Sequence, residues 1–144
     1  MKLLIWHVDS FRSTITEKGR SPFVEEPVET ETYVEEALIV FSAVEKSDES
    51  DPDKTAREAA RTIKKHAKKV GAVNVVVHPF AHLFADLGSP ESSIRIMDTV
   101  NDLLNERGLN SIRTPFGWFN RLEINAKGHP LSRIARSAPH RADL

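Results

Sequence analysis

The sequence contains no cysteine, which excludes a thiolate nucleophile, a disulfide and a thiolate-bound metal together. It also has no excess of one charge, because 20 Lys and Arg residues face 21 Asp and Glu residues. No overall basic field would therefore attract nucleic acid. No apolar run approaches the ~20 residues of a membrane span, and the first residues lack the pattern of a signal peptide. These absences predict a cytoplasmic protein with no membrane contact.

The length and composition are typical of one globular domain. A chain of 144 residues, 40% apolar and 28% charged, buries about 68–70% of its unfolded surface. We expect the folded domain to cover residues 1–136 and residues 137–144 to form a tail or the start of a linker. Because the net charge is −1, contact with RNA would depend on local basic patches. The candidates are Lys64, Lys65, Lys68, Lys69, Arg113, Arg121, Lys127, Arg133 and Arg136.

Motifs of side-chain nucleophiles are also missing. There is no Gly-x-Ser-x-Gly elbow of a serine hydrolase, and the serines fall in helix caps and polar loops. Lys46 and Lys127 could act as bases only if they were desolvated. The residues themselves therefore offer no obvious nucleophile.

Apolar runs of strand length predict the sheet. Residues 3–8 and 37–44 read as buried strands, the first of them ending at Asp9. The polar, acidic stretch 10–32 is expected to form at most short strands or a hairpin. Further strands are expected at 73–77, 112–114 and 121–125.

Two helices are predicted from their end signals. The first begins at Asp51-Pro52, carries an alanine-rich apolar stripe and ends at Gly71. The second begins at Ser89-Pro90 and ends at Arg107-Gly108. Two helices among mixed strands predict an α/β domain with a layered mixed sheet.

Four short motifs lie where a strand gives way to a loop, the usual place for a site on a rigid scaffold. They are Val44-Glu45-Lys46, His78-Pro79-Phe80-Ala81-His82-Leu83, Pro115-Phe116-Gly117-Trp118-Phe119 and Lys127-Gly128-His129-Pro130-Leu131.

The histidines first raise the possibility of a metal site. His78 and His82 are four residues apart, which on a helix would place both rings on one face, and Asp9 could add a carboxylate. Pro79, however, biases His78 away from helical geometry. We therefore expect structural or substrate-facing histidines and no bound metal.

Backbone and aromatic groups are the stronger candidates. Small Ala81 leaves its N–H open to a ligand, and such donors can hold a water or stabilise an oxyanion. Phe116, Trp118 and Phe119 surround Gly117, and one of these rings could stack a base for ~1–3 kcal/mol or simply belong to the core.

Together, the four motifs resemble the N-terminal editing domain of archaeal threonyl-tRNA synthetases, which is related in fold to D-aminoacyl-tRNA deacylases. The similarity runs from Met1 to about Arg136 in consistent order and spacing. The resemblance implies ester hydrolysis that removes mischarged L-serine from threonine-specific tRNA. It also implies that main-chain atoms and the ribose 2′-hydroxyl position the water, and that no cofactor takes part.

The resemblance also implies the site residues. Two positions depart from the family pattern, with Asn120 where members often have Lys and Arg133 where they often have Glu. If that Glu holds the substrate ammonium, another acid such as Glu45 would have to replace it. Ala81 and His82 are expected to be catalytic. Substrate binding is expected from His7, Val44, Glu45, Lys46, Pro79, Phe80, Trp118, Phe119, Asn120 and His129.

Partners and alternatives follow from the same resemblance. The expected partner is the 3′ end of tRNA(Thr) carrying serine, and relatives pair as homodimers. A synthetic threonyl-tRNA synthetase module is expected in cis or in trans. The alternatives are a D-aminoacyl-tRNA deacylase, whose Ser-Gln-x-Thr and Asn-x-Gly-Pro-x-Thr motifs are absent, a non-catalytic tRNA-binding module and a metal hydrolase.

Overall fold

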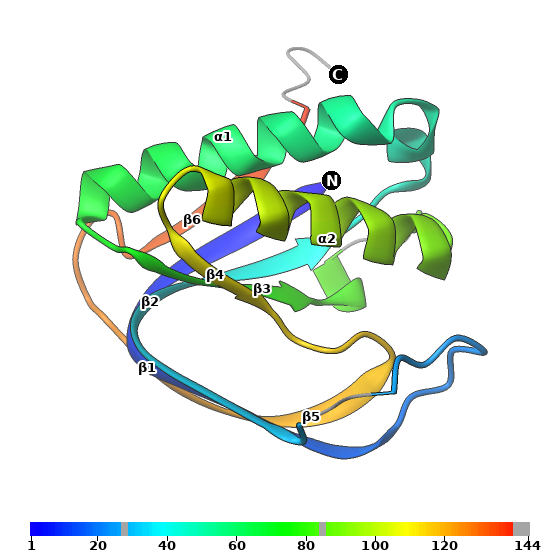
Figure 1. Cartoon of the computed structure of the whole chain (residues 1–144). Helices are drawn as coiled ribbons and strands as arrows, with labels where there is room; N and C mark the ends of the chain where they lie inside the picture. Colours follow the sequence, from blue (N-terminus) through cyan, green and yellow to red (C-terminus); the bar gives the residue numbers. More distant parts are fainter. Residues whose placement is uncertain (27–28, 84–85, 140–144) are drawn as a thin grey trace.

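The computed structural model describes residues 1–26, 29–83 and 86–139. Its elements alternate between strands and helices along the chain (Figure 1). In order, they are β1 (Lys2–Lys18), β2 (Glu31–Ala43), the 3-10 turn η1 (Lys46–Ser50), α1 (Pro52–Val70), β3 (Asn74–Pro79), the 3-10 turn η2 (Ala81–Leu83), α2 (Pro90–Glu106), β4 (Asn110–Arg113), β5 (Trp118–Ala126) and β6 (Arg133–Ser137).

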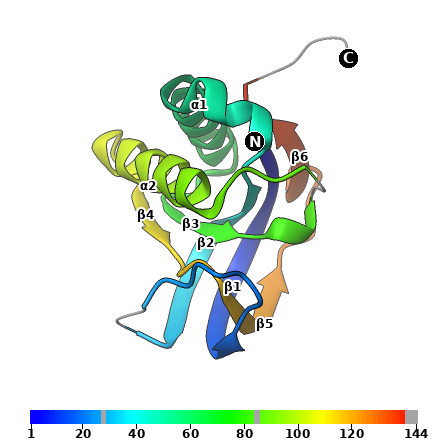
Figure 2. The ribbon, with the colours of Figure 1, turned by 90° about the vertical axis from the view of Figure 1, so that its right-hand side faces the viewer.

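The six strands form one mixed sheet in the order β4-β3-β2-β1-β5, with β6 also paired to β1. β1 is antiparallel to β2, β5 and β6, whereas β2, β3 and β4 run parallel to one another. Both helices lie on one face of this sheet (Figures 1 and 2). The prediction of a layered α/β domain with a mixed sheet and two main helices is confirmed.

The helix ends follow the predicted signals. Asp51 caps α1 by accepting a hydrogen bond from the Lys54 N–H at 3.2 Å, and Pro52 is the first helical residue. Gly71 ends α1 with a φ of 74°, a left-handed conformation that glycine adopts at low cost. Ser89 caps α2 in the same way as Asp51 caps α1, through the Ser92 N–H. Neither helix is long and apolar enough to cross a membrane.

Two hydrophobic clusters pack on the two faces of the sheet. The larger lies under the helices and joins the alanine stripe of α1 to Leu3, Ile5, Leu38 and Val40. The smaller lies on the face away from the helices and includes Phe11, Ile39 and Phe41. Because side chains alternate along a strand, β1, β2 and β3 each contribute to both clusters.

The first strand is longer than predicted, and its expected end at Asp9 was wrong. β1 continues to Lys18 because its second half pairs with β5, from Val8 opposite Ala126 to Lys18 opposite Trp118. The register shifts by one residue between Val8 and Ser10, which marks a β-bulge. Figure 1 shows β1 and β5 curving away from the helices beyond this point.

Charged groups surround the bend. Lys127 binds Asp9, and its Nζ lies 3.0 Å from Glu36 Oε2. Glu36 itself has a φ of 47°, uncommon for a residue with a side chain. The amide of Asn74 donates to the Glu35 carbonyl at 3.0 Å, which supports this backbone. The Lys127 motif therefore helps to fix the curvature of the sheet.

The last strand, β6, was not predicted. It pairs Lys2 with Ser137 and Trp6 with Arg133, alongside the first half of β1. Ala138 follows it, is buried, and donates its N–H to the Met1 carbonyl at 2.9 Å. The remainder of the predicted tail, residues 140–144, lies outside the described residues.

Candidate functional site

A cavity of about 520 Å³ opens on the sheet face away from the helices. Three segments far apart in sequence line it: the end of β3 with η2, the turn that leads into β5, and the loop after β1. The lining residues are Gly19, Arg20, Ser21, His78, Pro79, Phe80, Ala81, His82, Phe116, Gly117, Trp118, Phe119, Asn120 and Leu122. Two of the four predicted motifs therefore meet in one place.

The first wall is the chain that leaves β3. The Phe80 N–H donates to the Ser42 carbonyl of β2 at 2.8 Å, which anchors this exit to the sheet. Ala81 and His82 follow and are exposed. Within the described parts of the chain, no acceptor meets the N–H of either residue, as expected where a turn begins. These two donors are available to a ligand.

His78 is the polar residue beneath this wall. Its side chain is buried, its Nδ1 lies 2.7 Å from Thr114 Oγ1, and its ring meets Phe11 and Phe41 edge-on. Burial lowers the pKa of His78 from its ordinary value to about 4. The ring is therefore neutral at physiological pH and serves as a fixed, hydrogen-bonded part of the cavity floor.

The second wall is the aromatic turn at Gly117, which has a φ of 91°. A Cβ there would lie 2.7 Å from the Phe23 carbonyl oxygen and 3.0 Å from Val24 Cα. The Gly19 N–H also donates to the Gly117 carbonyl at 2.8 Å. The loop after β1 thus packs directly on the turn, and only glycine fits at this contact.

Glu25 holds the same turn through both side chain and backbone. Its carboxylate makes two hydrogen bonds with Arg113, at 2.6 and 2.7 Å, and accepts the Phe116 N–H at 2.7 Å. The Glu25 carbonyl accepts Trp118 Nε1 at 2.5 Å. Burial acts to raise the pKa of Glu25, but the hydrogen bonds from Arg113 and Phe116 outweigh it and leave this pKa below its ordinary value. Glu25 therefore fixes the indole at the cavity wall as an ionised anchor.

Asn120 leaves an open hydrogen-bonding position in the cavity lining. Its Nδ2 is buried, and no acceptor among the described residues lies within hydrogen-bonding distance. A buried donor without a partner costs about 1–3 kcal/mol. A ligand with an acceptor at this place would remove that cost.

Seven predicted site residues line the cavity together: Pro79, Phe80, Ala81, His82, Trp118, Phe119 and Asn120. Phe119 is the most exposed of the aromatic group, at 46%.

The Val44-Glu45-Lys46 motif lies apart from this lining. Val44 belongs to the core under the helices, and the Lys46 N–H donates to the Asp86 carbonyl at 3.1 Å. Glu45 Oε1 accepts the Met1 ammonium at 3.0 Å, so its carboxylate already holds a cation. A substrate role for these three residues stays a prediction.

His7 and His129 form a pair elsewhere, in a shallower hollow of about 470 Å³ beside Lys69 and Lys127. His7 Nδ1 lies 2.9 Å from His129 Nε2. The Leu131 N–H donates to His129 Nδ1, so a neutral His129 carries its proton on Nε2 and donates to His7. Burial, and then the charge of Lys127, lower the pKa of His7. The predicted substrate contacts of both histidines remain untested.

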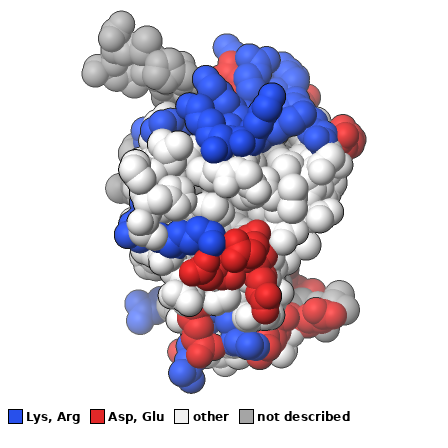
Figure 3. Space-filling view, turned by 90° about the vertical axis from the view of Figure 1, so that its left-hand side faces the viewer, with Lys and Arg blue, Asp and Glu red and all other residues white. Residues whose placement is uncertain are grey.

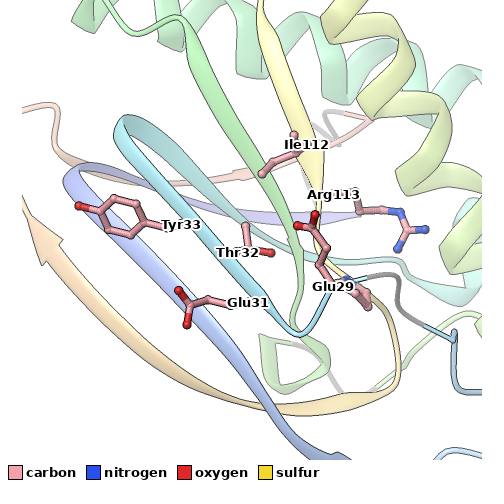
Figure 4. Close-up of a pocket in the computed structure, with 7 residues that line it drawn as sticks. Glu29, Glu31, Thr32, Tyr33, Ile112 and Arg113 are labelled. Carbon is pink, nitrogen blue, oxygen red and sulfur yellow. The ribbon is translucent and has the colours of Figure 1, made fainter.

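A further hollow, of about 410 Å³, lies near the β4 edge of the sheet (Figure 4). Glu29 and Glu31 give its lining a negative character. Its cation, Arg113, turns its guanidinium toward Glu25 and Asp98 instead. This hollow offers no positive group to a phosphate-bearing ligand.

The histidines are not arranged as a metal site. His78 lies in β3 and His82 in η2, so the two do not share a helical face. In residues 1–26, 29–83 and 86–139, no group of three His, Cys, Asp or Glu side chains is placed to hold a metal ion.

Sequence reasoning missed several contributors to the cavity. Gly19, Arg20 and Ser21 come from the stretch 10–32, for which only short strands were expected. Glu25 gave no signal because it stands in an acidic run, and its partner Arg113 is 88 residues away. A single Arg next to a turn motif could have suggested a buried ion pair, but not which acid it meets.

The fold and cavity define an α/β domain in which backbone N–H groups without an acceptor among the described residues lie opposite aromatic rings. The chain belongs to the family described as the archaea-specific editing domain of threonyl-tRNA synthetase, which matches residues 1–138. Its place is thus among the proofreading domains of an aminoacyl-tRNA synthetase.

Among similar proteins, three are called threonine–tRNA ligase. The one from Methanocaldococcus jannaschii is 40% identical over 94% of this chain, that from Thermococcus onnurineus 37% over 95%, and that from Methanopyrus kandleri 36% over 95%. The chain spans about 22% of the length of each of these relatives.

Proposed function

We propose that this domain hydrolyses the ester that links L-serine to the 3′-terminal adenosine of threonine-specific tRNA. Water adds to the ester carbonyl carbon, the bond from this carbon to the ribose oxygen breaks, and that oxygen leaves with a proton. The products are free serine and deacylated tRNA. Family membership and the cavity both support this reaction.

The observation that carries the proposal is the meeting of two unlike walls in one cavity. The Ala81 and His82 N–H groups on one wall have no protein acceptor among the described residues and suit the ester and its attacking water. Trp118 and Phe119 on the other wall suit the terminal adenine, since stacking on an aromatic ring contributes ~1–3 kcal/mol per base. An aminoacyl-adenosine needs both kinds of contact at once.

Selectivity for serine follows from size. Threonine has one more methyl group, and a synthetic site discriminates such a difference by only ~1–3 kcal/mol. A second pocket that admits serine and excludes threonine by steric clash completes a double sieve. Small Ala81 leaves room for the serine side chain.

The chemistry in this proposal needs no side-chain nucleophile. His78 is buried against Thr114, and Lys127 binds Asp9 and Glu36 away from the cavity. Backbone N–H groups and the ribose 2′-hydroxyl of the substrate would therefore orient the water. His82 would contribute its exposed ring near the scissile bond.

The test is single-turnover deacylation of tRNA(Thr) charged with serine or with threonine. Serine should be released at least tenfold faster than threonine. A seryl ester on tRNA that ends in 2′-deoxyadenosine should react about 10²–10³-fold more slowly, as when one preorganised donor is lost. This loss should exceed that of His82→Ala. Equal rates on serine and threonine esters would contradict the proposed specificity, and a 2′-deoxy substrate that reacts normally would contradict the mechanism.

Three further measurements distinguish the alternatives. Faster release of D-amino acids than of L-serine would identify a D-aminoacyl-tRNA deacylase instead. Loss of activity with a chelator, restored by a divalent metal, would identify a metal hydrolase. Tight tRNA binding without any deacylation would leave a binding module.

The proposed function also implies partners for this domain. We infer that tRNA(Thr) is the partner and that a synthetic module of threonyl-tRNA synthetase acts with this domain, in cis or in trans. A homodimer is expected from the family. Sedimentation of the 144-residue chain tests the dimer, and addition of the chain to a mischarging synthetase tests action in trans.

A further inference from the structure

The outer face of α1 carries most of the unbalanced positive charge of this protein. The helix contains seven Lys and Arg residues and two Asp and Glu residues, a net charge of +5. The whole chain has a net charge of −1, so all other residues together carry −6. Charge is therefore strongly segregated in a protein that is close to neutral overall.

The cations of α1 form one stripe opposite its buried side. At 100° per residue, Arg57, Arg61, Lys64, Lys65 and Lys68 fall on the side away from the alanine face, and all five are exposed. We call these five residues the basic stripe. Figure 3 shows Lys and Arg side chains gathered at the top of the molecule, whereas cations lower on this face lie beside acidic groups.

The stripe has no close acidic partners among the described residues, unlike Arg113 and Lys127. Among the described residues, none of its five members lies within 4.0 Å of a carboxylate oxygen. Arg113 is bound by Glu25 and Asp98, and Lys127 by Asp9 and Glu36. Exposed cations held together without counter-charges repel one another, so the stripe would gain from a bound polyanion.

The positive surface continues onto β6. Arg136 is exposed on the side of β6 that faces the helices, the side of Ile134. Burial lowers the pKa of the nearby His66, and the charges of Arg136 and Lys69 lower it further, despite a hydrogen bond to the Leu131 carbonyl that raises it. Arg136 and Lys69 thus lie close to one buried ring and extend the stripe at the end of α1.

We propose that the basic stripe binds the phosphate backbone of the double-stranded stem of an RNA. This inference rests on the proposed function, because the RNA is the one whose 3′ end enters the cavity. From Arg57 to Lys68 the helix rises about 16 Å, and side chains one turn apart are ~5–6 Å from each other. A duplex carries roughly one phosphate per 1.7 Å of axis, which suits such a row of cations. The stripe lacks the apolar and aromatic residues that membrane-surface helices use.

The position of α1 suits a single RNA that reaches both places. α1 begins beside η1, and η1 is bonded to the segment after η2, since Glu49 accepts the Ser89 N–H at 2.7 Å. The helix then runs away across the molecule (Figure 1). A stem along α1 would leave its unpaired 3′ nucleotides to descend past η1 toward Ala81 and Trp118.

The test compares two triple variants of the full chain with the same loss of charge. The stripe variant is Lys64→Gln, Lys65→Gln, Lys68→Gln. The control is Arg12→Gln, Arg95→Gln, Arg107→Gln, on β1, on α2 and at the end of α2. Binding to tRNA(Thr) and to a blunt RNA duplex is measured from 50 to 300 mM salt, with hydrolysis of a seryl-CCA trinucleotide as a separate readout.

The stripe variant should bind both RNAs at least tenfold more weakly at 0.15 M salt, and its salt slope should fall by about 2–3. The control should change binding less than threefold, and both variants should hydrolyse the trinucleotide normally. Lys64→Arg, Lys65→Arg, Lys68→Arg should restore duplex binding, which excludes a folding defect. Equal weakening in stripe and control variants, or equal affinity for polyglutamate and RNA, would overturn the proposal. Loss of trinucleotide hydrolysis in the unmodified protein would instead contradict the proposed function alone.

Discussion

His78, in the cavity floor, makes the stability of the folded protein depend on pH. Well above pH 6.5 its ring is neutral in folded and unfolded chains, so it adds no pH dependence. As the pH falls from 6.5 towards about 4, the unfolded chain binds a proton that the folded chain does not, and the folded state loses stability. The full loss is on the order of 3 kcal/mol. His7 and His66, whose pKa values are also lowered, add to it in the same direction.

We therefore expect urea melts to show a free energy of unfolding that declines from pH 7 to pH 4. His78→Asn should lower the stability at pH 7 but remove the part of this decline that His78 causes. The measured quantity is the difference between the pH slopes of the unmodified protein and the variant. Contributions from other titrating groups are the same in both proteins and cancel in this difference. An unchanged slope in the variant would mean that His78 is protonated as easily in the folded chain as in the unfolded chain.

We expect Asn120 to contribute to substrate binding but not to the stability of the folded protein. Asn120→Leu removes a buried donor that has no acceptor among the described residues, so the free energy of unfolding should stay within about 0.5 kcal/mol or rise slightly. Release of serine from tRNA(Thr) should fall at least tenfold, mainly through KM. The control is Asn125→Leu, on the exposed side of the same strand. A large loss of stability together with normal kinetics would show that Asn120 is structural.

Among the turns and strands, the Gly117 turn is the most sensitive point of the aromatic wall. Gly117→Ala would place a Cβ 2.7 Å from the Phe23 carbonyl oxygen, at a φ that disfavours side chains. We expect the free energy of unfolding to fall by about 2–4 kcal/mol because of overpacking and backbone strain. Gly71→Ala is the matched control, because its φ is also positive but nothing lies within 4 Å of the new Cβ.

Gly71→Ala should lower the free energy of unfolding by only about 1 kcal/mol. Chemical denaturation measures both variants, and tryptophan fluorescence reports whether the Trp118 wall has moved. Similar costs at the two glycines would mean that the loop after β1 yields to the new methyl group, and that the close approach to Phe23 is not a constraint.

The helices could be predicted because their signals are local. Asp51-Pro52, Gly71 and Ser89-Pro90 each act within one turn of the helix that they begin or end. β6 was missed for the opposite reason. Ile134 is its only large apolar residue, and its strand partner in β1 lies about 130 residues away. Edge strands of this kind take their structure from a neighbour that local sequence patterns do not reveal.

The candidate site likewise has a part that local sequence patterns predict and a part that depends on long-range contacts. The His78–Leu83 and Pro115–Phe119 motifs were recognised, and the structure brings their residues together. Their meeting depends on the bend beyond Asp9 and on Glu25, and both involve contacts across roughly 90 to 120 residues. The residues of the walls were therefore predictable, but the means of holding the walls against each other was not.

On the scale of the whole molecule, the sheet separates two surfaces. The cavity lies on the face without helices, and the basic stripe lies on the outer side of α1. A catalytic pocket and an RNA-stem contact on different sides could be altered independently. The stripe variant should therefore lower RNA affinity and leave hydrolysis of the trinucleotide unchanged, whereas Asn120→Leu should slow that hydrolysis and leave binding of the blunt duplex unchanged.

The long pairing of β1 has a consequence for how the protein is made. β1 is translated before every other strand of the sheet, but the strands that cover one of its edges, β5 and β6, end at Ala126 and Ser137. At 5–20 residues per second, translation from Lys18 to Ser137 takes roughly 6–24 s. Until β5 is made, all of this edge of β1 has only water, or another nascent chain, to pair with, and the half that pairs with β6 stays open until Ser137. Newly made copies on crowded polysomes are thus most exposed to aggregation before the last strand of the sheet is translated.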